Sequence, residues 1–296
     1  MKTIKPLGIV LGLLLIASLT ACHKDKAGVY TPKKKIQQIY YSWNDTEKEP
    51  FQHWEWNGDK LNSITHYSDF DFKSDPWIEN FTYENDRVTR VDNFTNSEYI
   101  TYEYDSDHLK SATVFYRNAI ACTWAISYDG DKISKMMGTF YDDYKKDGAT
   151  LHLNPLSHLL PPNIGESVAP CEQRLRNQRE EKETFTIALL LTWTDNNISK
   201  IVVTGEGEYM DFQLQYDNKN CPWYGFMGGL EDYLINFTSG HTGFTKNNVT
   251  CIIMTEDDYT DTIRYSYQYN SDKYPVLQTI YEVEDPDDKQ VLYFEY

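Results

Sequence analysis

Histidine and acidic residues are the side chains in this sequence that could do acid–base or metal chemistry, but none has the spacing that such a site needs. His152 and His158 are separated by Pro155, and no His-Glu-x-x-His motif occurs. The 45 Asp and Glu residues are too scattered to identify the carboxylate pair of a glycosidase, whose separation decides the chemistry. No Gly-x-Ser-x-Gly, P-loop or dinucleotide-binding motif is present. We therefore predict no catalytic residue, no metal site and no cofactor, in a protein that is not an enzyme.

Aromatic residues are the candidates for binding a ligand, because the chain has seven tryptophans. Trp54 and Trp56 are two positions apart and would share one face of a strand. Trp223, Tyr224 and Phe226 lie in a glycine-containing stretch that could form a lid over an opening. Both groups could stack on sugar rings or line an apolar groove. The alternative is that they pack in the core of the protein's own sheet.

Four cysteines after residue 22 are candidates for disulfide bonds, and they are Cys122, Cys171, Cys221 and Cys251. In an oxidising compartment they would allow two disulfides in any of three pairings. Cys171 is the favoured member, because a bridge there would fix the longest insertion in the chain. No Cys-x-x-Cys pair occurs, so the sequence indicates neither a redox motif nor a zinc cluster.

The first 21 residues have the organisation of a bacterial secretion signal. Lys2 and Lys5 form its charged end, and an apolar core follows that is too short to span a bilayer comfortably. The core ends in Leu19-Thr20-Ala21-Cys22, which resembles a bacterial lipobox and implies cleavage before Cys22 and acylation of that residue. Two or more acyl chains hold a protein stably on a membrane. We expect residues 1–21 to be a lipoprotein signal peptide and residues 22–35 to be the lipidated cysteine and a flexible tether.

A repeated motif organises the rest of the chain. In each copy an aromatic residue precedes a short Asn/Asp/Gly/Ser cluster, and a basic or other polar residue and spaced apolar residues follow. The copies occupy residues 54–64, 82–91, 103–114, 126–136, 192–201, 216–220 and 265–273. Asn, Asp and Gly close tight turns, and the flanking aromatic and β-branched residues favour strands. Self-similarity at such a spacing predicts an array of β-hairpins, in which each unit buries its apolar face against its neighbours.

These features predict an all-β protein with a single β-repeat domain over residues 36–296. We expect a long antiparallel meander of repeated hairpins, curved into an open barrel, and a two-sheet sandwich is the alternative. Two insertions, about 143–183 and about 221–237, interrupt the repeat. Their composition predicts one or two short helices.

The lipobox followed by these units resembles the Bacteroidetes lipoproteins of the DUF4595-like family, and the units are distantly similar to YD-repeat β-arrays. Asn218-Lys219-Asn220-Cys221-Pro222-Trp223-Tyr224-Gly225 looks like the family's Asn-Pro-aromatic-x-Gly signature, with Cys221 in place of Asn. Lys273-Tyr274-Pro275 looks like its terminal Gly-Tyr-Pro. The resemblance covers nearly the whole mature chain. It implies an envelope lipoprotein of no assigned activity, with no catalytic residue to transfer.

The negative net charge of the chain limits the kinds of partner that it could bind. The formal net charge is −17, and cleavage after Ala21 would remove two lysines and no acid, so nucleic-acid binding is not expected. Three functions remain: a non-catalytic envelope lipoprotein that binds a glycan, peptide or envelope partner; an open-barrel carrier of lipid or lipoprotein; and a structural component of a surface complex with its partner on a sheet edge. We expect an outer-membrane lipoprotein. The sequence leaves open whether it faces the periplasm or the cell surface. Residues 23–26 hold only one acid, so they match poorly the acidic surface-export tags of the Bacteroidetes.

Overall fold

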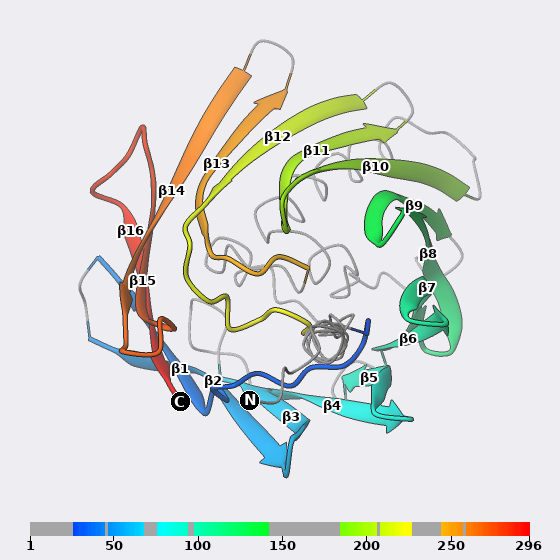
Figure 1. Cartoon of the computed structure of the whole chain (residues 1–296), viewed down its shortest axis with the longest axis horizontal. Coiled ribbons are helices and arrows are strands. Elements are labelled where there is room, and N and C mark those ends of the chain that lie inside the picture. Colours follow the sequence, from blue (N-terminus) through cyan, green and yellow to red (C-terminus); the bar gives the residue numbers. More distant parts are fainter. Residues whose placement is uncertain are drawn as a thin grey trace, which may run out of the picture.

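Sixteen β-strands follow one another around a closed antiparallel barrel (Figure 1). The computed structural model describes residues 26–44, 47–67, 76–93, 98–141, 184–205, 208–226, 244–256 and 259–296. The strands are β1 (Gln38–Trp43), β2 (Glu49–Asn57), β3 (Lys60–His66), β4 (Trp77–Glu84), β5 (Arg87–Asn93), β6 (Glu98–Asp105), β7 (His108–Tyr116), β8 (Ala119–Asp129), β9 (Lys132–Tyr141), β10 (Thr184–Thr194), β11 (Asn197–Gly205), β12 (Glu208–Tyr216), β13 (Val249–Glu256), β14 (Tyr259–Tyr269), β15 (Pro275–Glu282) and β16 (Lys289–Glu295).

Pairing of the first and last strands closes the barrel. The β1–β16 register runs from Gln38 opposite Glu295 to Trp43 opposite Gln290, and every other strand pairs with its neighbours in sequence. The all-β meander of hairpins is confirmed. The prediction of an open barrel is wrong, because the two strands that would have been its edges pair with each other, and the sandwich alternative is wrong for the same reason.

No helix occurs among the described residues. The predicted insertion at 221–237 begins with turns in its described part, residues 221–226, instead of the expected helix. Its remainder and the insertion at 143–183 lie outside the described residues.

A β-bulge at the aromatic position of the repeat shapes seven of the antiparallel strand pairs. In each one the register shifts at the aromatic residue of the repeat or at the residue before it. On the first strand of each pair the shift falls at Glu55/Trp56, Thr82/Tyr83, Glu103/Tyr104, Ser127/Tyr128, Thr192/Trp193, Gln215/Tyr216 and Gln268/Tyr269, and the extra residue lies on the second strand. Bulges bend a strand and increase its local twist, and a sheet needs such bending to close into a barrel. The turns that follow use residues with positive φ, such as Gly58 and Asn85.

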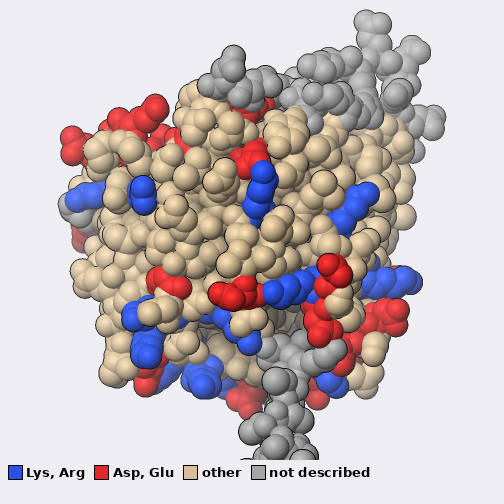
Figure 2. Space-filling view, turned by 45° about the horizontal axis from the view of Figure 1, so that its top comes forward, with Lys and Arg blue, Asp and Glu red and all other residues tan. Residues whose placement is uncertain are grey.

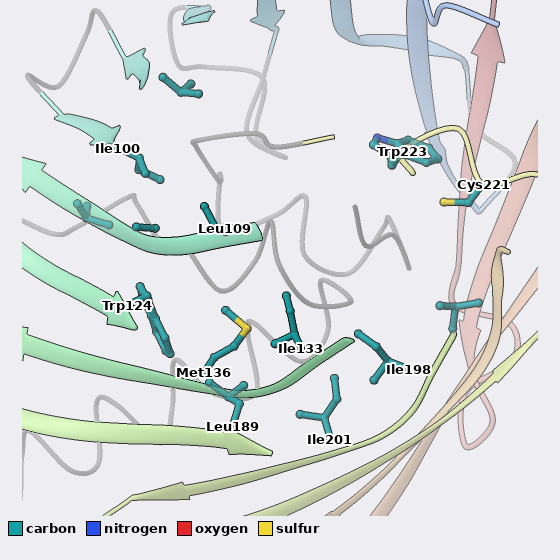
Figure 3. Packing of buried hydrophobic residues seen from close by; sticks show 14 of the residues in the cluster. Ile100, Leu109, Trp124, Ile133, Met136, Leu189, Ile198, Ile201, Cys221 and Trp223 are labelled. Carbon is teal, nitrogen blue, oxygen red and sulfur yellow. The ribbon is translucent and has the colours of Figure 1, made fainter. Parts of the chain in front are cut away.

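Side chains alternate between an apolar interior and a polar exterior. Along β7, Leu109, Ala112 and Val114 are buried, whereas Lys110 and Thr113 between them face outward. Successive hairpins contribute such side chains to one hydrophobic cluster inside the barrel (Figure 3). Each hairpin thus buries its inner face only when its neighbours are in place, as the repeat predicts.

Candidate functional site

One end of the barrel carries the short turns of the repeat, and we call it the hairpin-turn end. Near this end eight aromatic side chains each donate a hydrogen bond of 2.5 to 3.0 Å to a backbone carbonyl of a neighbouring hairpin or of the segment before β1. The donor–acceptor pairs are Trp56–Ile36, Tyr83–Leu61, Tyr104–Val88, Tyr128–Leu109, Trp193–Ile133, Tyr216–Ile198, Tyr267–Val249 and Tyr296–Pro275. These eight residues form the aromatic collar. They place an apolar body in the core and satisfy their polar tip.

In several copies of the repeat, the basic residue contacts the next hairpin. Lys60 Nζ lies 2.8 Å from the Asp86 carboxylate and 5.4 Å from the centre of the Tyr83 ring. Lys35 makes the same pair of contacts with Asp59 and Trp56. Hydrogen bonding to these lysines lowers the pKa of Asp59 and of Asp86 below the ordinary value.

The pattern continues around the turn end. Arg87 pairs with Asp107 at 3.1 Å and lies over Tyr104, and His108 lies 3.6 Å from Asp131. We call this chain of contacts the charged rim. Acidic and basic side chains lie side by side across the lower part of the face shown in Figure 2. The rim explains why the repeat has an aromatic residue, an acid and a base at fixed positions.

The described part of the predicted tether packs against the turn end instead of hanging free. Ala27 N donates to Asp107 O at 3.0 Å, and Val88 N donates to Gly28 O at 2.9 Å. Tyr30 is 4% exposed, and its hydroxyl donates to Pro222 O at 2.7 Å. Burial raises the pKa of the Tyr30 phenol well above its ordinary value. In the view of Figure 1 this segment crosses the area that the ring of strands encloses.

A cleft of about 390 Å³ lies between this N-terminal segment, three turns of the rim and the β12–β13 connection. Its lining residues are Lys26, Ala27, Gly28, Val29, Thr31, Asp107, His108, Tyr128, Asp131, Lys132, Ile133, Trp193, Asn196, Tyr224, Gly225, Phe244 and Lys246. The volume falls within the range of small-molecule sites.

The lining combines lysines with aromatic side chains. Asp107 and Asp131 both face basic partners of the rim, namely Arg87 and His108. Lys132 donates to the backbone carbonyl of Asp195 and lies over Trp193. Lys246 Nζ lies 5.2 Å from the centre of the Tyr224 ring. Lys26 Nζ lies 3.9 Å from the Asp107 carboxylate, which Arg87 also contacts from outside the cleft. Three lysines thus line the cleft against two aspartates, so the cleft suits a ligand that carries negative charge.

The structure brings only one of the five predicted ligand-binding residues to the cleft, namely Tyr224. Trp54 is 2% exposed and contacts Phe226 and Tyr30, so it presents no face to a sugar. Trp56 is half-buried between Trp54, Tyr30 and Lys35. Most of the area of these two rings fills the space between the barrel wall and the N-terminal segment, although both residues also border an open hollow on β2. Their predicted role in ligand binding stays a prediction.

Trp223 does not act as part of a lid. It is buried and packs edge-on against Phe294 at 5.3 Å between ring centres. Tyr224 and Gly225, the next residues, turn toward the cleft, and Gly225 has a positive φ of 86°. A Cβ at Gly225 would lie 3.0 Å from Val29 O, so glycine permits the close approach of the two segments.

No disulfide joins two of the described cysteines. Cys122, Cys221 and Cys251 are all buried, and no bond links any two of them. Burial raises the pKa of the Cys251 thiol, which disfavours the reactive thiolate. The pairings that would join two of these three residues are therefore wrong, and a bridge to Cys171 stays a prediction. Cys171 and the predicted lipidation site Cys22 lie outside the described residues.

Sequence reasoning missed two groups of polar side chains. The cleft residues Lys26, Lys132 and Lys246 are remote in sequence, and Tyr128 and Trp193 belong to the repeat, which indicated strands and no binding role. Nothing in their spacing signals that they share a cleft.

The second group lies inside the barrel. His66 Nε2 is 3.6 Å from Glu79 Oε1, and both side chains are almost fully buried. His66 also stacks on Trp77 with ring centres 3.7 Å apart. Among the described residues no cluster of three or more His, Cys, Asp or Glu side chains could hold a metal ion. Nor does that part of the chain contain a helix long and apolar enough to cross a bilayer.

Comparison with known proteins gives a likeness of fold. No family model and no curated protein matches the chain. Among solved structures, it is similar to a porin-like protein from Bacteroides vulgatus ATCC 8482, with a TM-score of 0.52 and 10% identity over 88% of this chain and 98% of that one. A porin-like protein from Bacteroides uniformis ATCC 8492 has a TM-score of 0.48 and 9% identity over 90% of this chain and 99% of that one.

Only the first reaches a TM-score of 0.5, and at 10% identity it shows a shared fold alone. The DUF4595-like family and the YD-repeat units stay predictions.

Proposed function

We propose that this protein is a non-catalytic lipoprotein of the bacterial envelope, anchored through Cys22, whose barrel binds a negatively charged saccharide in the cleft at the hairpin-turn end. The observation that supports this function best is the cleft, because it joins lysines to aromatic rings in a chain that is acidic as a whole. Aromatic rings stack on the apolar faces of sugars, and ammonium groups bind carboxylates or sulfates.

The charged outer surface supports a location of the barrel in the aqueous phase beside the membrane and outside the bilayer. Charged side chains occupy outward positions on strands, where Lys200 pairs with Asp211 and Arg90 pairs with Asp92. Outer-membrane barrels instead present an apolar band to lipid and keep polar side chains inside. A lipid anchor then supplies the membrane attachment that such a surface does not.

A panel of oligosaccharides tests the binding site. We expect oligogalacturonides to bind the purified body in calorimetry, and their neutral galactose counterparts to bind at least tenfold more weakly. Lys246→Gln is expected to weaken oligogalacturonide binding about tenfold, since it removes one charge from the cleft. Lys48→Gln on β1–β2, away from the cleft, is the matched control and should leave binding unchanged. Equal binding by both variants, or no binding to any saccharide of a wider acidic panel, would contradict the proposal.

The two alternative functions find less support in the described residues. A lipid carrier needs a continuous apolar concavity under a lid, whereas the cleft is charged and Trp223 is packed in the core. A partner that adds a strand needs a free sheet edge, whereas all sixteen strands are paired on both sides.

A further inference from the structure

We infer that the anchored protein stands with its hairpin-turn end against the bilayer, so that the cleft lies at the level of the lipid headgroups. The inference rests on the proposed acylation of Cys22. In this orientation the turn end contacts the headgroup layer of the membrane into which the acyl chains insert. A saccharide bound in the cleft would lie at the same level.

Chain length sets the first constraint. Lys26 is four positions after Cys22, and even a fully extended chain of that length spans at most about 14 Å. Lys26 itself lines the cleft, so the acylated residue cannot lie farther than this from the cleft's edge.

The second constraint is that the segment after Lys26 is held in place. Its backbone bonds to Asp107 and Val88 fix residues 27 and 28 on the rim, and Tyr30 and Ile36 anchor it in the core. At Gly28 the chain passes the Tyr104 hydroxyl so closely that a Cβ would lie only 2.1 Å from that oxygen. Release of a longer tether would require breaking these hydrogen bonds and exposing Tyr30, both of which are unfavourable.

Charge favours the same orientation. The N-terminal segment adds Lys26, Lys33 and Lys34 to the turn end, where Lys26 lies 3.9 Å from Asp107 and Lys34 lies 2.8 Å from Asp272. At the opposite end, the β15–β16 loop contains Glu284, Asp285, Asp287 and Asp288, and all four are exposed. Burial and the nearby acids Asp261, Asp288, Asp285 and Glu284 raise the pKa of Glu282 at the base of this loop. An anionic bilayer attracts lysines and repels such a loop.

The two ends are far enough apart to be distinguished. A nine-residue strand such as β7 is about 30 Å long, and a tilt of about 40° leaves a height of roughly 20 Å along the barrel axis. A label at the turn end and one at the β15–β16 loop should therefore differ strongly in their distance from lipid.

The test uses the full chain, acylated in a bacterial host and reconstituted into vesicles of phosphatidylethanolamine and phosphatidylglycerol that contain a spin-labelled headgroup quencher. One fluorophore is placed at Glu84→Cys on the turn end and another at Glu284→Cys on the loop end, each in a Cys171→Ser background. Glu84 and Glu284 are both exposed, so a cysteine at either position can be labelled. The native thiols of Cys122, Cys221 and Cys251 are buried. We expect quenching at position 84 to exceed quenching at position 284 several-fold.

Mass spectrometry of the N-terminal peptide tests acylation of Cys22 separately from the orientation of the barrel. A chain without acylation overturns both the anchored lipoprotein and its orientation. An acylated chain with equal quenching at the two positions, or with stronger quenching at 284, overturns the orientation and leaves the lipoprotein function standing. A Cys22→Ser variant should lose vesicle binding, and retained binding would overturn the role given to the anchor.

Discussion

At the scale of single residues, the abundance of aromatic side chains has a structural explanation. Trp56 and Trp193 donate their indole N–H to backbone carbonyls, and six tyrosines of the aromatic collar do the same with their hydroxyls. Trp54 packs with Tyr30 and Phe226 where the N-terminal segment meets the wall. A tryptophan count therefore could not predict a ligand site here. Only Trp193 of the collar's tryptophans also borders the cleft.

Gly138 shows how tightly one of these rings is held. It lies opposite Trp124 across the β8–β9 pair, and a Cβ at this position would be 2.5 Å from the far edge of the indole. Trp124 is fully buried and edge-on to Phe140, so the indole has little room to move. We expect Gly138→Ala to lower the free energy of unfolding by about 1–3 kcal/mol through overpacking, measured by urea denaturation.

A smaller ring should relieve the clash. In the double variant Gly138→Ala/Trp124→Phe the two effects should not add, because the alanine methyl would occupy space that the indole leaves. Strictly additive losses would show that the glycine is required for another reason.

At the scale of the elements, the repeat predicted the hairpins but not their mutual contacts. Aromatic residues and Asn/Asp/Gly clusters act locally, so strands and turns could be read from the sequence. The partner of each basic residue lies on the following hairpin, and that contact depends on how neighbouring hairpins register. The seven bulges affect this register, and although each lies at the aromatic residue of the repeat, the sequence alone did not predict that the register shifts there.

Each ion pair of the charged rim can be tested separately by measuring carboxyl pKa values with nuclear magnetic resonance. Lys60→Gln should raise the pKa of Asp86 toward its ordinary value, because the hydrogen bond from Lys60 is the main cause of the lowered pKa. A lowered pKa contributes stability that is present above the unfolded value of about 4 and is lost as pH falls through the folded value. The titration of Asp59, which Lys35 holds, is the internal control.

The reciprocal variant completes this experiment. Lys35→Gln should shift the pKa of Asp59 and leave that of Asp86 unchanged. A shift of both carboxyl groups in either variant would mean that the rim responds to net charge and that its contacts are not pairwise.

At the scale of the whole molecule, closure and the cleft were beyond sequence reasoning for one physical reason. The closing β1–β16 pair and the cleft both join segments that are remote along the chain, such as Lys26, Asp107 and Lys246. A meander of hairpins has the same local pattern whether its ends meet or stay apart. What decides closure is the bend and twist accumulated at the bulges, together with the N-terminal segment that occupies the turn end.

The aromatic collar makes closure sensitive to alkaline pH. Burial raises the pKa of Tyr83 and of Tyr128 to about 12, and it raises those of Tyr104, Tyr216, Tyr267 and Tyr296 above the ordinary value as well. In the unfolded chain these phenols ionise near pH 10. The folded state therefore keeps protons that the unfolded state releases, so stability is full below pH 10 and falls as pH rises through the folded values.

We expect the barrel to unfold cooperatively as pH rises above about 10. Each ionised collar tyrosine would place a charge in the core and lose its donated hydrogen bond, and because the collar runs around the whole barrel, loss at one hairpin weakens its neighbours. Tyrosinate absorbance and far-ultraviolet circular dichroism, followed together, should change over the same pH interval, with the urea-unfolded chain as the reference for free tyrosines. Ionisation of most of the 24 tyrosines near pH 10 with the β-sheet signal intact would show that the collar does not hold the barrel closed.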